Sequence, residues 1–282
     1  MNDNVLGETP IDPPQQFEAG DSATVWLPGG TPRHHKQDEQ GYPVPVYDIR
    51  YDSDMHVQLV AVNASDDMVV AAARVSTLGA DTGTYVEDQP SELLIKYLMR
   101  NRHGSPFEHN QFTFLITAPV FVMREFHRHR VGWSYNEESA RYRELQPHFW
   151  VPEVGRKLVQ IGKSGHYELT HGTPETELAV TEATHVAYEV AWRAYRKMLN
   201  AGVAREVART VLPVGIYSSM YATCNARSLM HFLSLRTSAP SAAYPSKPQA
   251  EIEQVARAME QFLGQHMQFT WRAFQQYGRV AP

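Results

Sequence analysis

The chain has 282 residues, of which 43% are hydrophobic, so it can bury a substantial core, most simply as one large domain with an appendage. Its formal net charge of -5 gives no global basic field of the kind that binds a nucleic-acid backbone, and any polyanion site must therefore be local. The single cysteine, Cys224, excludes a disulfide framework within the chain, and no early apolar run resembles a signal peptide or a membrane span. We therefore expect a cytoplasmic protein with no membrane partner.

Residues 1–50 are rich in Pro, Gly, Asp and Gln, as in IDPPQQ, and show no sustained hydrophobic period. We interpret them as a flexible N-terminal arm and residues 51–282 as the folded domain. MHVQLVAVN at 55–63 predicts a strand, ASDDMVVAAARVS at 64–76 a helix that opens at Ser65, and PSELLIKYLMRN at 90–101 a helix with Ser91 at its N-cap. Regular structure is thus expected from about residue 55 onward.

The following segments predict one more strand and a helical second half. QFTFLITA at 111–118 alternates Phe, Phe and Ile with Thr, Leu and Thr, which is typical of a strand with at least one buried face. Tyr188, Trp192, Tyr195 and Leu199 recur at helical spacing, with a stop at 200–202, and residues 252–263 repeat this pattern in the last helix. We predict an α+β fold, with a modest central sheet flanked by long helices and no internal repeat.

A dense basic segment, EFHRHRV, occupies residues 125–131. If it is extended, Arg128 and Arg130 lie on one face and His127 and His129 on the other. Paired guanidinium groups match the oxygens of a phosphate or pyrophosphate, which favours an anion site, and an edge strand with exposed charge is the alternative. No metal is expected at the two histidines, because no Cys or carboxylate stands at a spacing typical of a zinc site.

The residues that follow the basic segment, Ser134–Glu137, fit a capping box, so a helix is predicted to begin there. Glu137 and Arg141 are four residues apart on that helix, and the simplest interpretation is a capped surface helix with an ion pair. The density of Arg, His, Glu, Ser and Asn beside a strand end favours a functional interpretation, namely an anion-binding site. A helix N-terminus binds anions, and the segment then forms a turn that recognises phosphate.

ATCNARSLMHFLSLRTS at 222–238 also predicts a helix with polar residues on two sides. Arg227, His231 and Ser234 share one side of the helical wheel, whereas Arg236 lies with Asn225 on the apolar side. Nine residues separate Arg227 from Arg236, roughly 13 Å along a helix, which is too far to clamp one phosphate. Two ligands, or one long ligand, fit better. The alternative is that both arginines pair with acids such as Glu206, Glu251 or Glu253.

Five separated blocks resemble the flavin-dependent thymidylate synthases, in the same order along the chain: HGSPFEH at 103–109, RHR at 128–130, SYNEESARY at 134–142, REVARTVLP at 205–213 and NARSLMHFLSLR at 225–236. The resemblance runs from about residue 55 to the C-terminus and identifies residues 51–282 as a catalytic domain of that kind. It implies a homotetramer with active sites between subunits, and each site holds FAD and dUMP against one another.

The resemblance also implies the reaction. The methylene group of methylenetetrahydrofolate moves to C5 of the uracil and is reduced by a flavin hydride that NADPH supplies, which gives dTMP and tetrahydrofolate. A cation beside N3 of the uracil raises the nucleophilicity of C5, so the chemistry needs no enzyme thiol. The FAD site is not expected to be a Rossmann site, because the chain has no Gly-rich G-x-G-x-x-G turn.

Residue roles follow from the matching blocks. The resemblance assigns FAD contacts to Ser105, Arg128, His129, Arg130, Asn225, Arg227 and His231, with His103 and Glu108 lining the same cavity. It assigns dUMP contacts to Glu125, Arg128, Glu137, Ser139, Ala140, Arg141, Arg209 and Arg236. Arg236 and Ser139 are the expected catalytic residues, and Arg236 favours ionisation at N3 of the uracil.

The chain departs from the family pattern at three places. Residues 131–138 place eight residues, where seven are usual, between RHR and Ser139. His231 stands where an amide is frequent, and Glu125 stands where Gln is frequent.

Two other classes of function remain open from sequence alone. One is a nucleic-acid-binding module that uses the basic segment on backbone phosphates and stacks bases on Trp133, Tyr135 and Tyr142. The acidic net charge argues against it. The other is a catalytically silent homologue in which the same motifs only hold a tetramer together. Neither alternative requires a bound flavin, so the yellow colour of oxidised flavin in the purified protein separates both from the enzyme.

Overall fold

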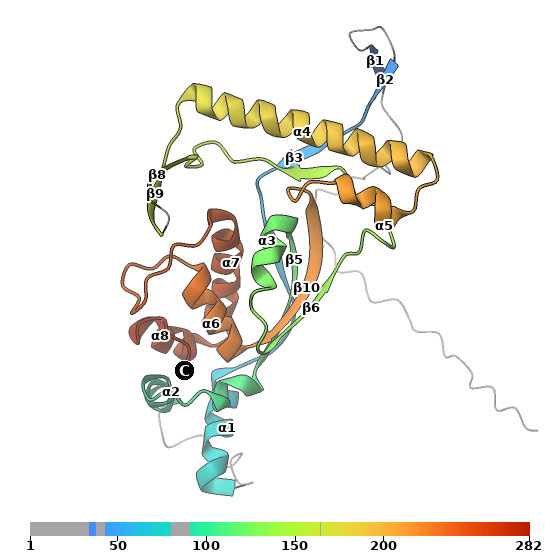
Figure 1. Ribbon diagram of the computed structural model, residues 1–282. Helices are drawn as coiled ribbons and strands as arrows, with labels where there is room; N and C mark the ends of the chain where they lie inside the picture. Colours follow the sequence, from blue (N-terminus) through green and yellow to red (C-terminus); the bar gives the residue numbers. More distant parts are fainter. Residues whose placement is uncertain (1–33, 38–42, 80–90, 164) are drawn as a thin grey trace, which may run out of the picture.

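The computed structural model describes residues 34–37, 43–79, 91–163 and 165–282, and its centre is a four-stranded antiparallel sheet (Figure 1). The strands of this sheet, in spatial order, are β4 (His56–Asn63), β5 (Gln111–Pro119), β10 (Tyr217–Asn225) and β6 (Trp133–Glu137). Three further pairs of short strands are β1 (His34–Gln37) with β2 (Pro43–Val46), β3 (Arg50–Asp52) with β7 (His148–Trp150), and β8 (Val159–Lys163) with β9 (His166–Thr170). The predicted α+β fold with a modest sheet is confirmed.

One face of the central sheet forms the main core. The apolar residues that alternate along β5, Phe112, Phe114 and Ile116, are fully buried on this face, as the period of two requires. Three helices pack against the same face (Figure 1): α3 (Val120–Phe126), α6 (Ala226–Arg236) and α7 (Ala250–His266). The basic segment and the polar helix 225–236 are therefore brought together on the covered side of the sheet.

Asp66 ties the first helix of the chain to the last. Helices α1 (Asp66–Leu78), α2 (Ser91–Arg100) and α8 (Gln268–Gln276) pack together beside the short 3-10 helix η2 (Ser105–His109). The Asp66 carboxylate accepts the N–H groups of Phe269 and Thr270 at 2.7 and 2.9 Å and the Thr270 hydroxyl at 2.7 Å. The first amides of a helix have no partner within that helix, so Asp66 caps α8 from a distant part of the chain.

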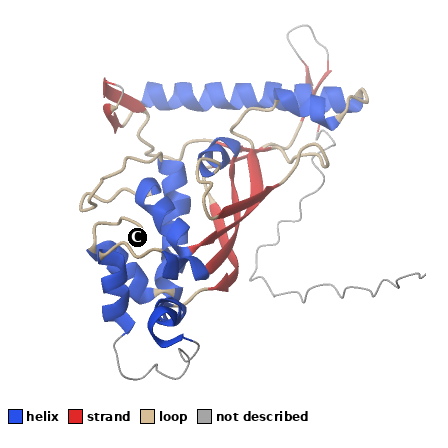
Figure 2. Cartoon of the chain, turned by 60° about the horizontal axis from the view of Figure 1, so that its bottom comes forward, coloured by secondary structure: helices blue, strands red, loops and turns tan. Residues whose placement is uncertain are grey.

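A second, smaller core lies where the long helix α4 (Pro174–Asn200) crosses one end of the sheet (Figure 2). Phe149 of β7 stacks on Tyr188 of α4 at 4.7 Å, and Trp192 is almost fully buried beside them. Two short helices, α5 (Arg205–Ala208) and η3 (Arg209–Val211), follow α4. Tyr47 and Ile49 pack against this second core. Most of the predicted flexible arm, residues 1–33 and 38–42, lies outside the described residues.

Several local predictions are confirmed. The strand at 55–63 is β4, the strand at 111–118 is β5, and the two long helical patterns are α4 and α7. Ser65 caps α1, and its hydroxyl accepts the N–H of Met68 at 3.1 Å. Helix α2 includes Ser91 as its first described residue, so Ser91 does not stand ahead of the helix. Within the described part of the chain, no helix is long and apolar enough to cross a membrane.

The predictions for residues 125–142 are wrong in two respects. The basic segment is not extended, because α3 continues to Phe126 and the chain then turns, with the N–H of His129 bonded to the Phe126 carbonyl at 2.8 Å. The capping box at Ser134 opens no helix, because residues 133–137 form β6 against β10. Trp133 and Tyr135 project from the same face of this strand onto Phe126, and their burial favours the strand over the helix.

The predicted helix at 222–238 begins four residues later than expected. Residues 217–225 form β10, and α6 starts at Ala226, with Asn225 as its N-cap. The Asn225 side chain accepts the N–H of Ser228 at 2.8 Å, which is the typical contact of this cap. The helical wheel is correct within α6, because Leu229 and Phe232 are fully buried while Arg227 is exposed.

Replacing Asp66 with Ala is expected to lower the free energy of unfolding by about 1–3 kcal/mol, because the buried Thr270 amide and hydroxyl lose their partner. Urea unfolding at one fixed protein concentration measures this loss. Asp67 is its exposed neighbour and serves as the matched control, since Asp67→Ala should stay within about 0.5 kcal/mol of the parent. Equal losses in the two variants would show that Asp66 does not hold α8 in place.

Candidate active site

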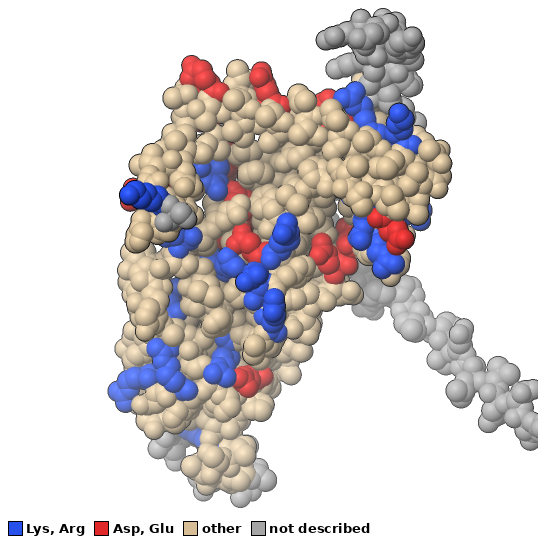
Figure 3. Space-filling model, viewed as in Figure 1, with Lys and Arg blue, Asp and Glu red and all other residues tan. Residues whose placement is uncertain are grey.

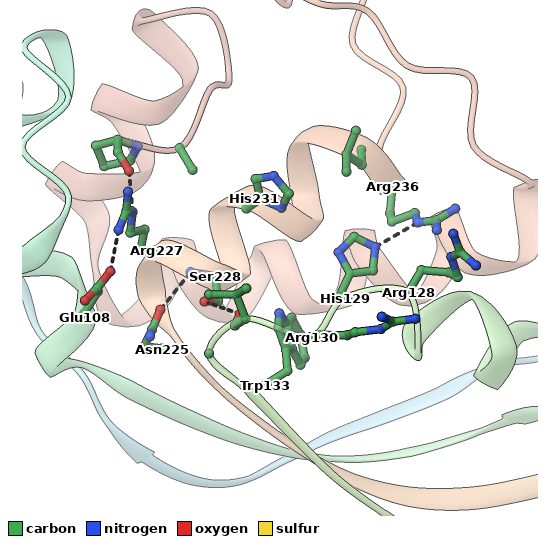
Figure 4. A pocket seen from close by; sticks show the side chains of 15 residues that line it. Glu108, Arg128, His129, Arg130, Trp133, Asn225, Arg227, Ser228, His231 and Arg236 are labelled. Atoms are coloured by element: carbon green, nitrogen blue, oxygen red, sulfur yellow. Dashed lines mark hydrogen bonds and ion pairs between the residues drawn. The ribbon is translucent and has the colours of Figure 1, made fainter.

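The candidate site is a cavity of about 900 Å³ between the turn after α3, helix α6 and the last residues of the chain (Figure 4). A volume of this size lies at the upper end of the range for small-molecule sites and accommodates a dinucleotide. The side chains and backbone that surround it belong to Glu108, Arg128, His129, Arg130, Val131, Gly132, Trp133, Asn225, Arg227, Ser228, His231, Leu235, Arg236, Ala281 and Pro282. Seven of the nine residues predicted to contact or surround FAD are in this set.

The turn at 127–132 forms one wall of the cavity. Arg128 and Arg130 are exposed and His129 between them is buried, so the two guanidinium groups are available to a ligand. Gly132 has a φ of +68°, and a Cβ at this position would overlap the Ser228 hydroxyl. The same hydroxyl donates to the Val131 carbonyl at 2.9 Å. The turn is therefore docked closely onto the first turn of α6, where only glycine fits.

Arg227 marks one end of the cavity, near the N-terminus of α6 (Figure 4). Its Nη1 forms an ion pair with Oε1 of Glu108 at 2.5 Å, and its Nε donates to the main-chain oxygen of Pro282 at 2.5 Å. The N-terminus of an eleven-residue helix adds a partial positive charge at this end. The N–H groups of Arg227 that these two acceptors leave unused, together with the helix N-terminus, fit the anionic part of a nucleotide cofactor.

Arg236 marks the other end, at the last residue of α6 (Figure 4). Its Nε donates to Nε2 of His129 at 3.1 Å, and its Nη1 pairs with Oε2 of Glu125 at 2.5 Å. Burial, followed by the positive charge of Arg236 and the proximity of His231, lowers the pKa of His129 to about 4. His129 is therefore neutral near pH 7, and its Nε2 is free to accept this hydrogen bond.

Glu125 is an unusual partner for Arg236. Burial raises the pKa of the Glu125 carboxyl, the charge of Arg236 acts in the opposite direction, and the nearby Glu251 raises it further. Oε1 of Glu125 is buried without a hydrogen-bond partner among the described residues. The carboxyl thus holds Arg236 through one oxygen only.

Both arginines of α6 pair with acids, as the alternative interpretation of this helix supposed, but with different acids from those expected. Glu206, Glu251 and Glu253 pair instead with Arg141, Arg156 and Arg257. The partners of the α6 arginines, Glu108 and Glu125, come from η2 and α3, which are distant in sequence.

Five of the eight residues predicted to bind dUMP line one of two pockets. Arg128 and Arg236 line the large cavity, whereas Glu137, Ala140 and Arg209 line a separate pocket of about 230 Å³. In that pocket the Ser218 hydroxyl donates to Glu137 at 2.8 Å. The two pockets share no lining residue, so the described part of one chain does not bring all the predicted substrate residues together.

Ser139 and Arg141 lie in the turn that follows β6. The main-chain N–H of Arg141 contacts the Ser139 hydroxyl at 3.4 Å, and the Arg141 guanidinium forms an exposed ion pair with Glu206 at 3.2 Å. The i, i+4 pair of Glu137 and Arg141 does not form, because the segment is not helical. The eight residues from 131 to 138 therefore comprise the rest of the turn, strand β6 and Glu138.

Ser105 and His103 do not line the large cavity. His103 packs edge-on against Tyr97 at 5.7 Å, and Ser105 is the exposed first residue of η2. The contribution of Ala281 and Pro282 was not predicted, and no sequence signal indicated it. Gly132 was also not assigned, although a glycine directly after a basic turn was a usable signal.

Two further observations limit the chemistry of the site. Cys224 is buried on β10, burial raises the pKa of its thiol well above the usual range, and it does not line the large cavity. Among the described residues, no three His, Cys, Asp or Glu side chains gather into a set that would hold a metal ion. The polar groups that surround the cavity are three guanidinium groups besides that of Arg236, two imidazoles, one amide, one hydroxyl and the carboxylate of Glu108, which pairs with Arg227, and this predominantly cationic donor set fits FAD.

Comparison with known proteins shows which family the chain resembles. The family model described as "Thymidylate synthase complementing protein" matches residues 58–267. A flavin-dependent thymidylate synthase of Streptomyces coelicolor is 58% identical over 232 residues, which cover 82% of this chain and 94% of that protein. The corresponding enzyme of Tropheryma whipplei is 50% identical over 233 residues, 82% of this chain and 96% of that protein.

A solved structure is also similar. The UMP/dUMP methylase PolB of Streptomyces cacaoi, bound with 5-Br dUMP, is 53% identical and superposes with a TM-score of 0.79 over 83% of this chain and 100% of that chain. A second structure of PolB, bound with 5-Br UMP, gives a TM-score of 0.76 at 52% identity. The chain belongs to the family of flavin-dependent thymidylate synthases.

Proposed function

We propose that this protein is a thymidylate synthase that converts dUMP to dTMP, with methylenetetrahydrofolate as the carbon donor, FAD as the redox cofactor and NADPH as the reductant. The observation that carries the proposal is the single cavity with Arg227 at one end and Arg236 at the other. The two arginines stand nine residues apart on α6, roughly 13 Å at 1.5 Å per residue, which separates a cofactor anion from a pyrimidine.

The FAD side of the site consists of cations and amide donors. Arg227 offers a guanidinium group to the pyrophosphate, and the N-terminus of α6 offers its partial charge at the same end, while Arg128 and Arg130 offer their guanidinium groups to the cofactor nearer Arg236 (Figure 4). Trp133 lines the same cavity with a flat apolar surface that suits an aromatic ring system. FAD, when bound here, supplies the hydride that reduces the transferred methylene group.

We infer that Arg236 acts on the uracil. A guanidinium beside N3 stabilises the negative charge that develops on the ring and so raises the nucleophilicity of C5. His129 orients this guanidinium by accepting from Nε, and it adds no charge because its pKa is about 4. The buried Cys224 thiol takes no part, because it does not line this cavity and burial raises its pKa.

Completion of the substrate site requires a second copy of the chain. Glu137, Ala140 and Arg209 line their own small pocket, and we propose that in a homotetramer this pocket meets the large cavity of a neighbouring subunit. Ser139, adjacent to this pocket in the chain, would then reach the substrate as well. A cytoplasmic location fits an enzyme that consumes NADPH and folate.

Methylation of UMP is a second candidate function. The similar structures are those of a UMP/dUMP methylase, solved with brominated forms of both nucleotides. The two reactions differ only in the 2′ position of the sugar, so the same cavity and the same role of Arg236 serve both.

Anaerobic turnover tests the proposed function. The purified protein is supplied with FAD, NADPH and methylenetetrahydrofolate, and with either dUMP or UMP in parallel reactions. We expect dTMP to form from dUMP. If methylated product forms from UMP but not from dUMP, the substrate is UMP and the assignment of dUMP is wrong. A protein that holds flavin but forms product from neither nucleotide would be a catalytically silent homologue.

The two arginines of α6 are expected to respond oppositely to replacement. Arg236→Ala should retain FAD but lose about 10²–10³ of the turnover rate, as expected when one electrostatic partner of the transition state is removed. Arg227→Ala should bind FAD measurably but more weakly, because cofactor oxygens lose a charged donor. Flavin absorbance and the rate of dTMP formation at saturating dUMP separate the two effects.

Arg257→Ala is the matched control for both arginine variants, since Arg257 pairs with Glu253 on α7 and lines neither pocket. It should keep both flavin and turnover. If Arg236→Ala sheds its flavin while Arg227→Ala retains it, the two ends of the cavity are assigned in the wrong order.

Cys224→Ala is expected to keep most of the turnover, because the proposed chemistry forms no bond to sulfur. Alanine is preferred to serine here, since a hydroxyl at this buried position of β10 would need a new hydrogen-bond partner. The rate of dTMP formation per bound flavin is the measurement. A folded, flavin-loaded variant without turnover would point to a thiol mechanism.

A further inference from the structure

The last residues of the chain contact the same arginine that the flavin is expected to need. Pro282 is buried, lines the large cavity together with Ala281, and accepts the Nε–H of Arg227 at 2.5 Å through its main-chain oxygen. Glu108 holds Nη1 of the same guanidinium. The hydrogen bonds of Arg227 within the described residues thus use Nε and one N–H of Nη1, which leaves both N–H groups of Nη2 and the second N–H of Nη1 for a ligand anion.

This terminal segment is anchored by two other arginines. Arg279 is buried, and its guanidinium donates to Glu260 and to Thr237, each at 2.7 Å at the nearest. Arg102 donates from Nη1 to the carbonyls of Val280 at 2.8 Å and of Ala281 at 3.3 Å. The path of residues 280–282 along the cavity is therefore held by Arg102, which contacts the segment itself, and by Arg279, which anchors the residue before it.

The backbone of both anchors is strained. Arg102 has a φ of +61° and Arg279 a φ of +55°, and these are the only non-glycine residues with positive φ among those that the structure describes. Side chains with a Cβ rarely adopt this region, and they persist in it where surrounding contacts determine the backbone, commonly at functional sites. Arg102 lies in the turn that ends α2 and Arg279 in the turn that follows α8, so the ends of two helices position the side chains that hold this segment.

Gly104 supplies a third constraint. A Cβ at this position would lie 2.5 Å from Nε of Arg227 and 2.7 Å from the main-chain oxygen of Pro282. The backbone of residue 104 thus approaches both partners of this hydrogen bond, and any larger residue would displace them. Its own φ of -82° is accessible to alanine, so replacement would act through this contact and not through the backbone.

We propose that residues 280–282 are a positioning element of the cofactor site, which orients the Arg227 guanidinium so that Nη2 faces the phosphate oxygens of FAD. This inference rests on the proposed flavin function. Arg227 is exposed and long, and without the acceptor for Nε only its ion pair with the exposed Glu108 would restrict its rotamers. The segment removes this freedom before the cofactor binds, which strengthens binding by preorganisation.

Two variants test this positioning element in the full-length protein. Deletion of residues 281–282 removes the acceptor, and Gly104→Ala displaces both partners with a single methyl group. The FAD dissociation constant is measured by flavin fluorescence after removal and return of the cofactor. We expect each variant to bind FAD about tenfold more weakly, which corresponds to about 1.4 kcal/mol, near the lower end for a charge-assisted hydrogen bond.

Gly264→Ala is the matched control, because a Cβ there meets only Trp271 at ordinary contact distance, 3.6 Å. It should bind FAD as the parent does. Circular dichroism of each apoprotein shows whether it remains folded. If the deletion variant does not fold, the FAD dissociation constant of Gly104→Ala alone tests the inference.

A double-mutant cycle separates positioning from general support of the fold. In an Arg227→Ala background, deletion of residues 281–282 should cause no further loss of FAD affinity, because the segment acts through that side chain. An additional tenfold loss in this background would overturn the inference, as would unchanged affinity in both single variants. In these two cases the proposed function stands as long as the parent protein binds FAD. If the parent protein binds no FAD, both fail.

Discussion

The hydrogen bond from Arg236 to His129 is the contact on which the candidate site most depends. It joins the C-terminal end of α6 to the turn after α3, and it exists only if the imidazole is unprotonated, because Nε2 must accept. Burial is the main cause of the low pKa of His129, so the packing of Phe232 and Trp133 around the ring is also what permits the hydrogen bond. A protonated His129 would place two like charges in contact and release Arg236. Packing in the hydrophobic core therefore keeps Nε2 of His129 unprotonated, and this nitrogen in turn holds Arg236 in the cavity.

Local charge is organised differently from net charge. The chain is acidic as a whole, yet Figure 3 shows Lys and Arg side chains grouped in the middle of one face, with Asp and Glu side chains beside them. At the large cavity, Arg227 and Arg236 each have one carboxylate partner, Glu108 and Glu125. Such pairing fixes the direction of each guanidinium and leaves other donors for a ligand. A cavity of this kind suits a small anionic ligand with defined geometry better than an extended polyanion.

Prediction from sequence succeeded where the spacing of apolar residues within one strand or helix determined which face is buried. The alternation of Phe112, Phe114 and Ile116 identified β5, and the wheel of α6 separated Arg227 from Arg236, because both patterns reflect one buried face. It failed at residues 133–137, where a capping-box pattern competed with two aromatics at period two, and tertiary packing on Phe126 decided for the strand. The carboxylate partners of Arg227 and Arg236 lie more than a hundred residues away, so no local pattern could identify them. The same is true of the wall formed by Ala281 and Pro282.

The central claim is that flavin and nucleotide occupy one continuous site, with the cofactor toward Arg227 and the pyrimidine toward Arg236. Addition of dUMP to the flavin-loaded protein tests it most directly, with the flavin absorption spectrum and the heat of binding recorded in parallel. The account predicts that the flavin bands shift as dUMP is added and that the shift saturates together with the heat. Binding of dUMP with measurable heat and an unchanged flavin spectrum would place the nucleotide away from the flavin and contradict the account.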